Sequence, residues 1–124
     1  MIQELKKDYV TFDNTGKIIQ WGNCQSSLVN NQAFNPNETS IEGLVSNSEI
    51  QYVSNNVVIN RPINPASLFG TTISNLINPS IVSINGKPYM VTDTIVDLTF
   101  PKAGKYEIIV SCWPYLDANF TVTV

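Results

Sequence analysis

Three short runs of β-branched and aromatic residues, separated by turn-forming residues, make up the last third of the chain. The runs are Thr94–Phe100, Lys105–Trp113 and Asn119–Val124, with Pro-Lys-Ala-Gly and Pro-Tyr-Leu-Asp-Ala between them. Val, Ile, Thr, Tyr and Phe favour the extended backbone of a β-sheet, whereas Pro, Gly and Asp interrupt it. The pattern therefore predicts three consecutive β-strands.

Apolar and polar residues alternate along the last two runs, as expected for strands with one buried face. In the final run Phe120, Val122 and Val124 alternate with threonines. In the run before it, every second side chain from Tyr106 to Cys112 would lie on one face. We expect the core of the C-terminal half to contain Phe100, Tyr106, Ile108, Val110, Phe120 and Val122.

Three further pairs of runs have the form of β-hairpins. Turn-forming residues at Asp13–Gly16, Asn55–Asn56 and Asn85–Gly86 each lie between two apolar runs. Asn-Gly is the strongest of these signals, because both residues of a tight hairpin turn need positive φ. Thr72–Ile77 is an additional strand candidate, whereas Ala66–Gly70 is expected to form a helical turn or coil.

The chain is predicted to be all-β, with an N-terminal β-hairpin module and a C-terminal immunoglobulin-like antiparallel β-sandwich. Two prolines in Asn60–Pro65 interrupt regular structure, and we place a boundary there that gives modules of residues 1–62 and 63–124. The second module holds about six short strands in roughly sixty residues, which suits a small sandwich.

Charged residues are scarce, and this limits the kinds of partner. They make up 14% of the chain, whereas soluble domains average about a quarter. The net charge is −3 and the seven Lys and Arg are scattered, so the sequence argues against nucleic-acid binding. No run approaches the roughly 20 apolar residues that cross a bilayer, and no signal peptide is visible. We expect a protein that is made in a bacterial cytoplasm and has no membrane span.

No catalytic or metal site can be assembled from the sequence. The chain has no His, which is the commonest metal ligand and general base. Asp13-Asn14 lacks the spacing of a calcium loop, and Cys24 and Cys112 are expected to be reduced thiols. The acidic residues of the second half suit turns and solvated strand faces better than a catalytic pair; they are Asp93, Asp97, Glu107 and Asp117. We expect no enzyme activity, no catalytic or metal-binding residue and no cofactor.

The segment Asn23–Glu38 is the first candidate interface. It is long, irregular and rich in Asn, yet it carries Leu28, Val29 and Phe34, which are costly to leave in water. We expect these side chains to pack on a neighbouring subunit. The alternative is that they cover the exposed face of the first hairpin, with Trp21 as the floor.

Trp113 and Tyr115 form the second candidate interface. They follow a predicted strand in the motif Trp-Pro-Tyr-Leu, where exposed rings could stack on sugars or cover a partner's surface. The alternative is that Trp113 and Leu116 close one end of the sandwich core.

Short motifs along most of residues 9–124 resemble the small β-rich proteins encoded among tail and tail-fibre genes of tailed bacteriophages. The first-half motifs are Phe12-Asp-Asn-Thr-Gly-Lys-Ile-Ile, Trp-Gly-Asn-Cys24, Ile41-Glu-Gly43, Tyr52-Val53 and Val57-Val-Ile-Asn-Arg-Pro62. The second-half motifs are represented by Phe100, Gly104, Tyr106 and Trp113–Leu116. The chain departs from these proteins in its richness in Asn and in lacking their acidic loops.

The resemblance implies a non-enzymatic virion structural protein: a tail, fibre or neck-attached module, or a decoration subunit. Its partners would be other virion proteins, and we expect it to be a homo-oligomer or particle-bound. Two alternatives remain open. The protein could be a carbohydrate-binding module that recognises a host surface glycan, or an assembly chaperone of tail fibres that leaves the virion.

Overall fold

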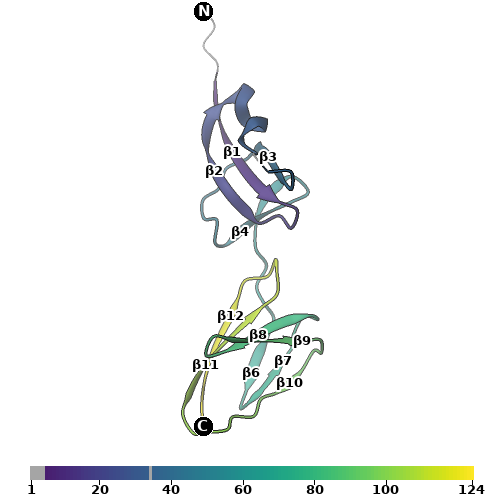
Figure 1. The fold of residues 1–124 in the computed structure, drawn as a ribbon, viewed down its shortest axis with the longest axis vertical. Helices are drawn as coiled ribbons and strands as arrows, with labels where there is room; N and C mark the ends of the chain where they lie inside the picture. Colours follow the sequence, from purple (N-terminus) through teal and green to yellow (C-terminus); the bar gives the residue numbers. More distant parts are fainter. Residues whose placement is uncertain (1–4, 34) are drawn as a thin grey trace, which may run out of the picture. The chain divides into compact units, whose positions relative to one another are not determined.

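A computed structural model describes residues 5–33 and 35–124 of the chain. It confirms the predicted all-β class, because strands dominate and one short 3-10 helix accompanies them in the described part. The chain divides into two compact units, Met1–Arg61 and Pro62–Val124, each with its own core. Figure 1 labels most of the elements of both units.

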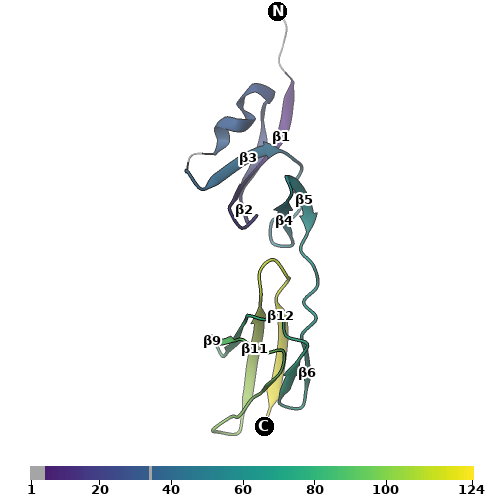
Figure 2. The ribbon, with the colours of Figure 1, turned by 90° about the vertical axis from the view of Figure 1, so that its right-hand side faces the viewer.

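Unit 1 contains a three-stranded antiparallel sheet and a separate hairpin. The sheet has the order β2-β1-β3 (Figure 1), and the hairpin pairs β4 with β5 (Figure 2). The bounds are β1 Lys6–Asp13, β2 Ile18–Gln25, the 3-10 helix η1 Ser26–Gln32, β3 Glu38–Glu42, β4 Gln51–Ser54 and β5 Val57–Asn60.

The core of unit 1 forms where the β4–β5 hairpin meets the sheet. Val10 from the central strand β1 packs with Ile18, Val45 and Val53. The turn between β1 and β2 is tied to β4, because the Val53 N–H donates to the Gly16 carbonyl oxygen at 2.9 Å. Gly16 has a φ of +84°, and a Cβ atom there would overlap the Val53 carbonyl oxygen. The close packing of these two hairpins therefore depends on glycine at position 16.

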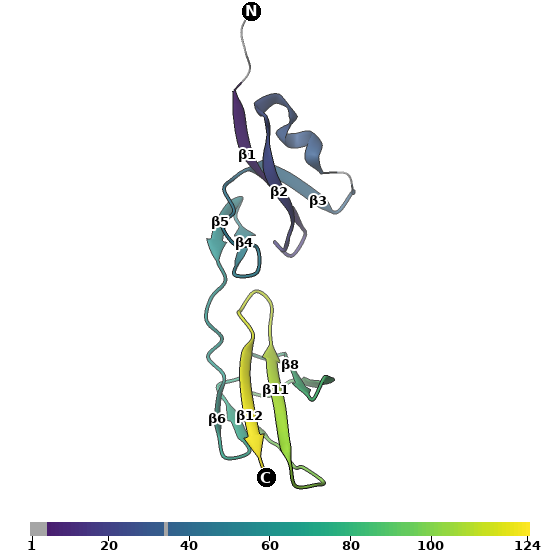
Figure 3. The ribbon, with the colours of Figure 1, turned by 90° about the vertical axis from the view of Figure 1, so that its left-hand side faces the viewer.

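Unit 2 is a small antiparallel β-sandwich. One sheet has the order β10-β7-β6 and the other the order β12-β11-β8-β9. Figure 3 shows β12 beside β11, with β8 beyond β11. The bounds are β6 Ser67–Phe69, β7 Thr72–Ser74, β8 Ser80–Ile84, β9 Lys87–Val91, β10 Val96–Asp97, β11 Lys105–Ser111 and β12 Ala118–Thr123. The immunoglobulin-like arrangement of these strands stays a prediction.

The core of unit 2 lies between its two sheets, and it largely agrees with the alternation in the sequence. The buried cluster consists of Ile73, Leu76, Val82, Ile108, Val110 and Val122, and Phe100 and Phe120 are partly buried against it. Tyr106 is half-buried beside Phe100, with ring centroids 4.4 Å apart, and its hydroxyl donates to the Lys102 carbonyl oxygen at 2.8 Å.

Three local expectations are wrong. Ala66–Gly70 is not a helical turn or coil, because Ser67–Phe69 pairs with β7 as strand β6. The run Thr94–Phe100 forms only the two-residue strand β10, since it pairs with just two residues of β7. Residues 26–32 of the supposedly irregular segment form the 3-10 helix η1, which lies against β1 and β3.

Candidate interaction surface

A shallow apolar hollow lies on the outer face of the four-stranded sheet of unit 2. It has a volume of about 380 Å³. We call it the outer patch, and its residues are Pro79, Ser80, Ile81, Met90, Ser111, Cys112 and Trp113. Strand pairing assembles it, because Ile81 of β8 faces Met90 of β9 on one side and Ser111 of β11 on the other.

Large apolar side chains of the outer patch are open to solvent. Met90 is 67% exposed, Ile81 41% and Trp113 38%. None of the residues that line the hollow is charged. The Ser80 hydroxyl donates to the Ile77 carbonyl oxygen and is therefore already used within the chain. The patch offers apolar area with few polar groups to orient a ligand.

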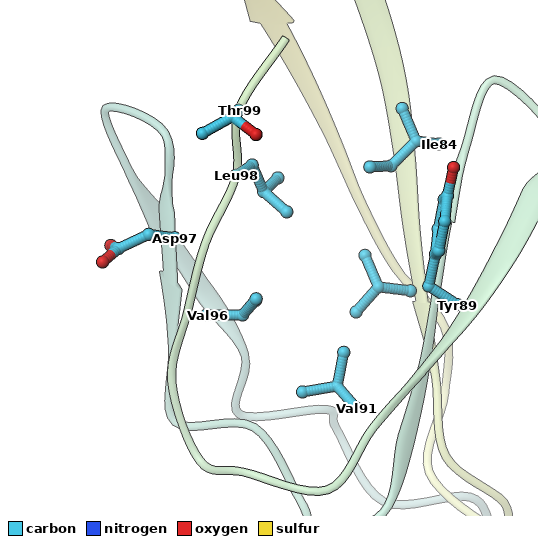
Figure 4. A pocket seen from close by; sticks show the side chains of 8 residues that line it. Ile84, Tyr89, Val91, Val96, Asp97, Leu98 and Thr99 are labelled. Carbon is cyan, nitrogen blue, oxygen red and sulfur yellow. The ribbon is translucent and has the colours of Figure 1, made fainter.

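A second hollow, of about 360 Å³, opens between the edges of the two sheets of unit 2. Figure 4 shows Ile84 and Tyr89 on one side of it and Val96 and Leu98 on the other. Asp97 also lines this hollow, but its side chain points away from the centre and accepts a hydrogen bond of 2.6 Å from the Thr72 hydroxyl. The hollow can hold an apolar group, but it presents no pair of groups suited to acid–base or nucleophilic chemistry.

A third hollow, of about 400 Å³, lies in unit 1 beside the β1–β2 turn. One carboxylate oxygen of Asp13 accepts hydrogen bonds from the Thr15 N–H at 2.8 Å, the Thr15 hydroxyl at 2.6 Å and the Lys17 N–H at 3.1 Å. This oxygen therefore holds the turn. Within residues 5–33 and 35–124, no group of three His, Cys, Asp or Glu side chains could hold a metal ion.

The hydrogen bonds at Asp13 have a consequence for stability against acid. Partial burial raises the pKa of the Asp13 carboxyl, but the hydrogen bonds from Thr15 and Lys17 and the charge of Lys17 together lower it below its ordinary value. A group whose pKa is lower in the folded state stabilises the fold above its unfolded pKa, and that contribution is lost as the pH falls through the folded pKa.

We expect Asp13→Asn to lower the unfolding free energy of unit 1 near neutral pH by less than about 1 kcal/mol, because the turn is largely exposed. The difference from wild type should be smaller at an acidic pH below the ordinary Asp pKa of about 3.9, because protonation of the wild-type carboxyl removes its contribution there. Denaturant unfolding at the two pH values measures this change. A difference that stays constant with pH would show that the charge of Asp13 does not contribute.

The candidate residues of the segment Asn23–Glu38 have different surroundings. Leu28 is exposed at the surface of η1, whereas Val29 is buried, with 5% of its surface accessible. Val29 therefore has little surface left for a neighbouring subunit, because η1 packs it within unit 1. Phe34 lies outside the described residues.

The second candidate pair is partly exposed. Trp113 belongs to the outer patch, and Tyr115 is half-buried in the turn that follows, where its N–H donates to the Cys112 carbonyl oxygen at 2.8 Å. Sequence reasoning missed Ile81 and Met90. The Asn85-Gly86 turn could have indicated them, because it sets the register of the β8–β9 hairpin. In that register Ile81 and Met90 pair on one face of the sheet, and Val82 and Val91 lie on the opposite face.

Glu107 and Asp93 of unit 2 make hydrogen bonds or an ion pair on its surface. Glu107 lies 3.8 Å from the Lys105 ammonium group and accepts a hydrogen bond of 3.0 Å from the Thr121 hydroxyl. Asp93 accepts a bond of 2.7 Å from the Thr94 N–H. Cys24 and Cys112 are both free thiols.

Comparison with known proteins found no matching family model, no similar curated protein and no similar solved structure. In the described part of the chain, no helix has the length and apolar character needed to span a membrane.

Proposed function

We propose that this chain is a non-enzymatic structural component of a bacteriophage virion that binds another virion protein through the outer patch. The observation that carries the binding role is the group of exposed apolar side chains at Ile81, Met90 and Trp113, in a hollow without charged residues. The centres of protein–protein interfaces are enriched in Trp and Met and depleted of Lys, Glu and Asp.

A protein partner suits the outer patch better than a sugar does. A sugar that stacks on Trp113 would also need several polar side chains to bond its hydroxyl groups. The hollow offers Ser80, whose hydroxyl donates to Ile77, together with Ser111 and the weakly bonding thiol of Cys112. An apolar protein surface would make no such demand, so we infer that the partner is a folded protein.

The sequence resemblance supports the virion setting. It points to a tail, fibre or neck-attached module, or to a decoration subunit. Mass spectrometry of purified particles from the source phage tests this role, because a structural protein should be present in a constant number of copies. Its absence from particles that need it for assembly would instead identify an assembly chaperone.

We expect Met90→Glu to reduce incorporation into particles at least about tenfold, because it places a charge in the apolar contact. The matched control is Phe69→Glu, which changes an exposed apolar side chain on the other sheet of unit 2. Both variants are supplied in cells infected with phage that lack the gene, and particle-bound protein is quantified. Equal incorporation of the two variants would contradict the role of the outer patch.

The same two variants separate the protein partner from a glycan partner. On a glycan array, we expect the wild-type protein to show no glycan binding that depends on the outer patch. Any signal it gives should therefore be the same for Met90→Glu. Specific binding that is lost in Met90→Glu and kept in Phe69→Glu would assign the outer patch to a host glycan instead.

A further inference from the structure

Strand β12 forms an open edge of the four-stranded sheet of unit 2. It stands at one end of the order β12-β11-β8-β9 and, among residues 5–33 and 35–124, pairs only with β11. An edge strand exposes a row of N–H and C=O groups that can pair with another strand. The pairing of β12 with β11 shows which of its backbone groups face outward.

The hydrogen bonds at the end of the β11–β12 ladder fix the direction of these groups. Gly104 and Val124 exchange two backbone bonds of 2.9 Å, so they form a hydrogen-bonded pair. Such pairs alternate along an antiparallel ladder, and Val122 and Phe120 therefore also bond towards β11. The backbone groups turned to the open edge belong to Asn119, Thr121 and Thr123.

The partner strand supports this assignment independently. Glu107 faces Thr121 in the ladder. The Glu107 carbonyl oxygen accepts a hydrogen bond of 2.9 Å from the Asn85 N–H, and the Glu107 N–H donates one of 2.9 Å to the Asn85 side-chain oxygen. Both backbone groups of Glu107 therefore point towards β8. Residues that face each other in a non-hydrogen-bonded pair turn their backbone groups in opposite directions. The groups of Thr121 therefore point away from β11.

The two edges of this sheet differ. The opposite edge strand β9 is joined to β8 by the two-residue turn Asn85-Gly86, so Ile84 and Lys87 form the closing hydrogen-bonded pair. The backbone groups of Pro88 and Met90 then point away from β8 towards the open edge, and Pro88 has no N–H to donate. β12 has none of the usual protection against pairing, because its sequence Ala-Asn-Phe-Thr-Val-Thr contains no Lys, charged residue or Pro.

We propose that β12 pairs in antiparallel fashion with β12 of a second copy of this chain, forming a continuous eight-stranded sheet across a two-fold axis. Centring the pair on Thr121 puts Thr121 opposite Thr121 of the second copy, and Asn119 opposite Thr123 of the second copy. The three outward-facing residues of each strand then meet in hydrogen-bonded pairs. The strands are uncharged, and opposed threonines are favourable cross-strand neighbours.

The occupant is a second copy because the edge is complementary to itself. A two-fold interface requires the same residues on both sides. The alignment centred on Thr121 meets this requirement, because it pairs the outward backbone groups of Asn119, Thr121 and Thr123 with those of the same three residues in the second copy. The pairing leaves the outer patch on the sheet face, so it is separate from the proposed contact with another virion protein.

Sedimentation velocity of the full chain over a range of concentrations tests this pairing. Wild type should show a monomer–dimer equilibrium. Thr121→Pro should be monomeric, because it removes the central outward N–H without removing a bond to β11. Thr121→Val keeps that N–H and should still dimerise. Circular dichroism must show that each variant remains folded. A wild type that stays monomeric throughout its soluble range would overturn the proposal, as would a folded Thr121→Pro that dimerises normally.

Cross-linking tests the alignment without requiring the proline variant to fold. In a Cys24→Ser/Cys112→Ser background, Thr121→Cys should form a disulfide-linked dimer under mild oxidation. Asn119→Cys should not, because its neighbour is Thr123 of the second copy. Equal cross-linking of both variants, or of neither, would refute the alignment. A dimer that Met90→Glu disrupts and Thr121→Pro leaves intact would instead place self-association on the outer patch.

Discussion

Gly16→Ala should destabilise unit 1 more than any other small substitution in it, by about 3–5 kcal/mol. Two costs combine at this position. The φ of +84° disfavours a side chain, and the added Cβ would overlap the Val53 carbonyl oxygen. Relief of that overlap requires the β1–β2 turn to move away from β4, which would break the bond from the Val53 N–H to Gly16.

Gly86→Ala is the matched control for this prediction. Gly86 has nearly the same φ, +85°, but nothing lies within 4 Å of its ideal Cβ position. Its substitution should cost only the backbone strain, about 1 kcal/mol. If the two substitutions cost the same, the contact between Gly16 and Val53 does not limit the stability of unit 1.

Each unit can be followed separately in this experiment. The chain has two tryptophans, Trp21 in unit 1 and Trp113 in unit 2. In a Trp113→Phe background, fluorescence reports the unfolding of unit 1, and in a Trp21→Phe background it reports that of unit 2. Gly16→Ala should shift only the first transition and Gly86→Ala only the second.

Ile108→Ala should destabilise unit 2 by about 2–5 kcal/mol, because it leaves a cavity at the centre of the sandwich. Ile108 is 1% exposed and belongs to the buried cluster with Ile73 and Val82. Denaturant unfolding followed by the fluorescence of Trp113 measures the change.

The neighbouring residue provides the control for Ile108. Ile109 lies on the same strand but on the opposite face, and 40% of its surface is exposed. The same truncation there should change stability by no more than about 0.5–1 kcal/mol. A larger loss at Ile109 than at Ile108 would mean that the outer face of the sheet, not the inner one, is buried in the protein's working state.

Local signals were sufficient to predict hairpins in both units. Asn85-Gly86 and Asn55-Asn56 adopt positive φ at all four positions, and each turn joins the two strands expected on either side of it. The alternation along β11 correctly predicted the burial of Ile108 and Val110, because one face of this strand lies against the other sheet. Val124 failed this pattern, since it lies beyond the end of β12 and is exposed.

Elements that depend on distant partners could not be predicted in this way. Ser67–Phe69 is a strand only because β7 lies beside it. The helix η1 has no capping hydrogen bond from its N-cap side chain, no acidic residue in its first turn and no basic residue in its last turn. Its position depends on the burial of Val29 and on a bond of 3.5 Å from the Thr11 hydroxyl to the Gln32 carbonyl oxygen.

The candidate site was only partly visible in the sequence for a similar reason. Trp113 was recognisable as an aromatic residue beside a turn. Its neighbours Ile81 and Met90 come from strands that lie more than twenty residues earlier, so only the pairing of β8 with β9 and β11 brings them together. The exposed apolar character of the outer patch follows from that pairing and not from any local motif.

The proline on β9 has a consequence for the size of any assembly built on this sheet. A sheet that can be extended at both edges adds copies without limit and grows into a fibre. Pro88 removes one of the two N–H donors that β9 would otherwise turn outward, whereas the N–H of Met90 remains, so extension is favoured at β12 over β9. When two copies join at β12, each has used its more favourable edge, and growth of the sheet beyond a closed pair is disfavoured.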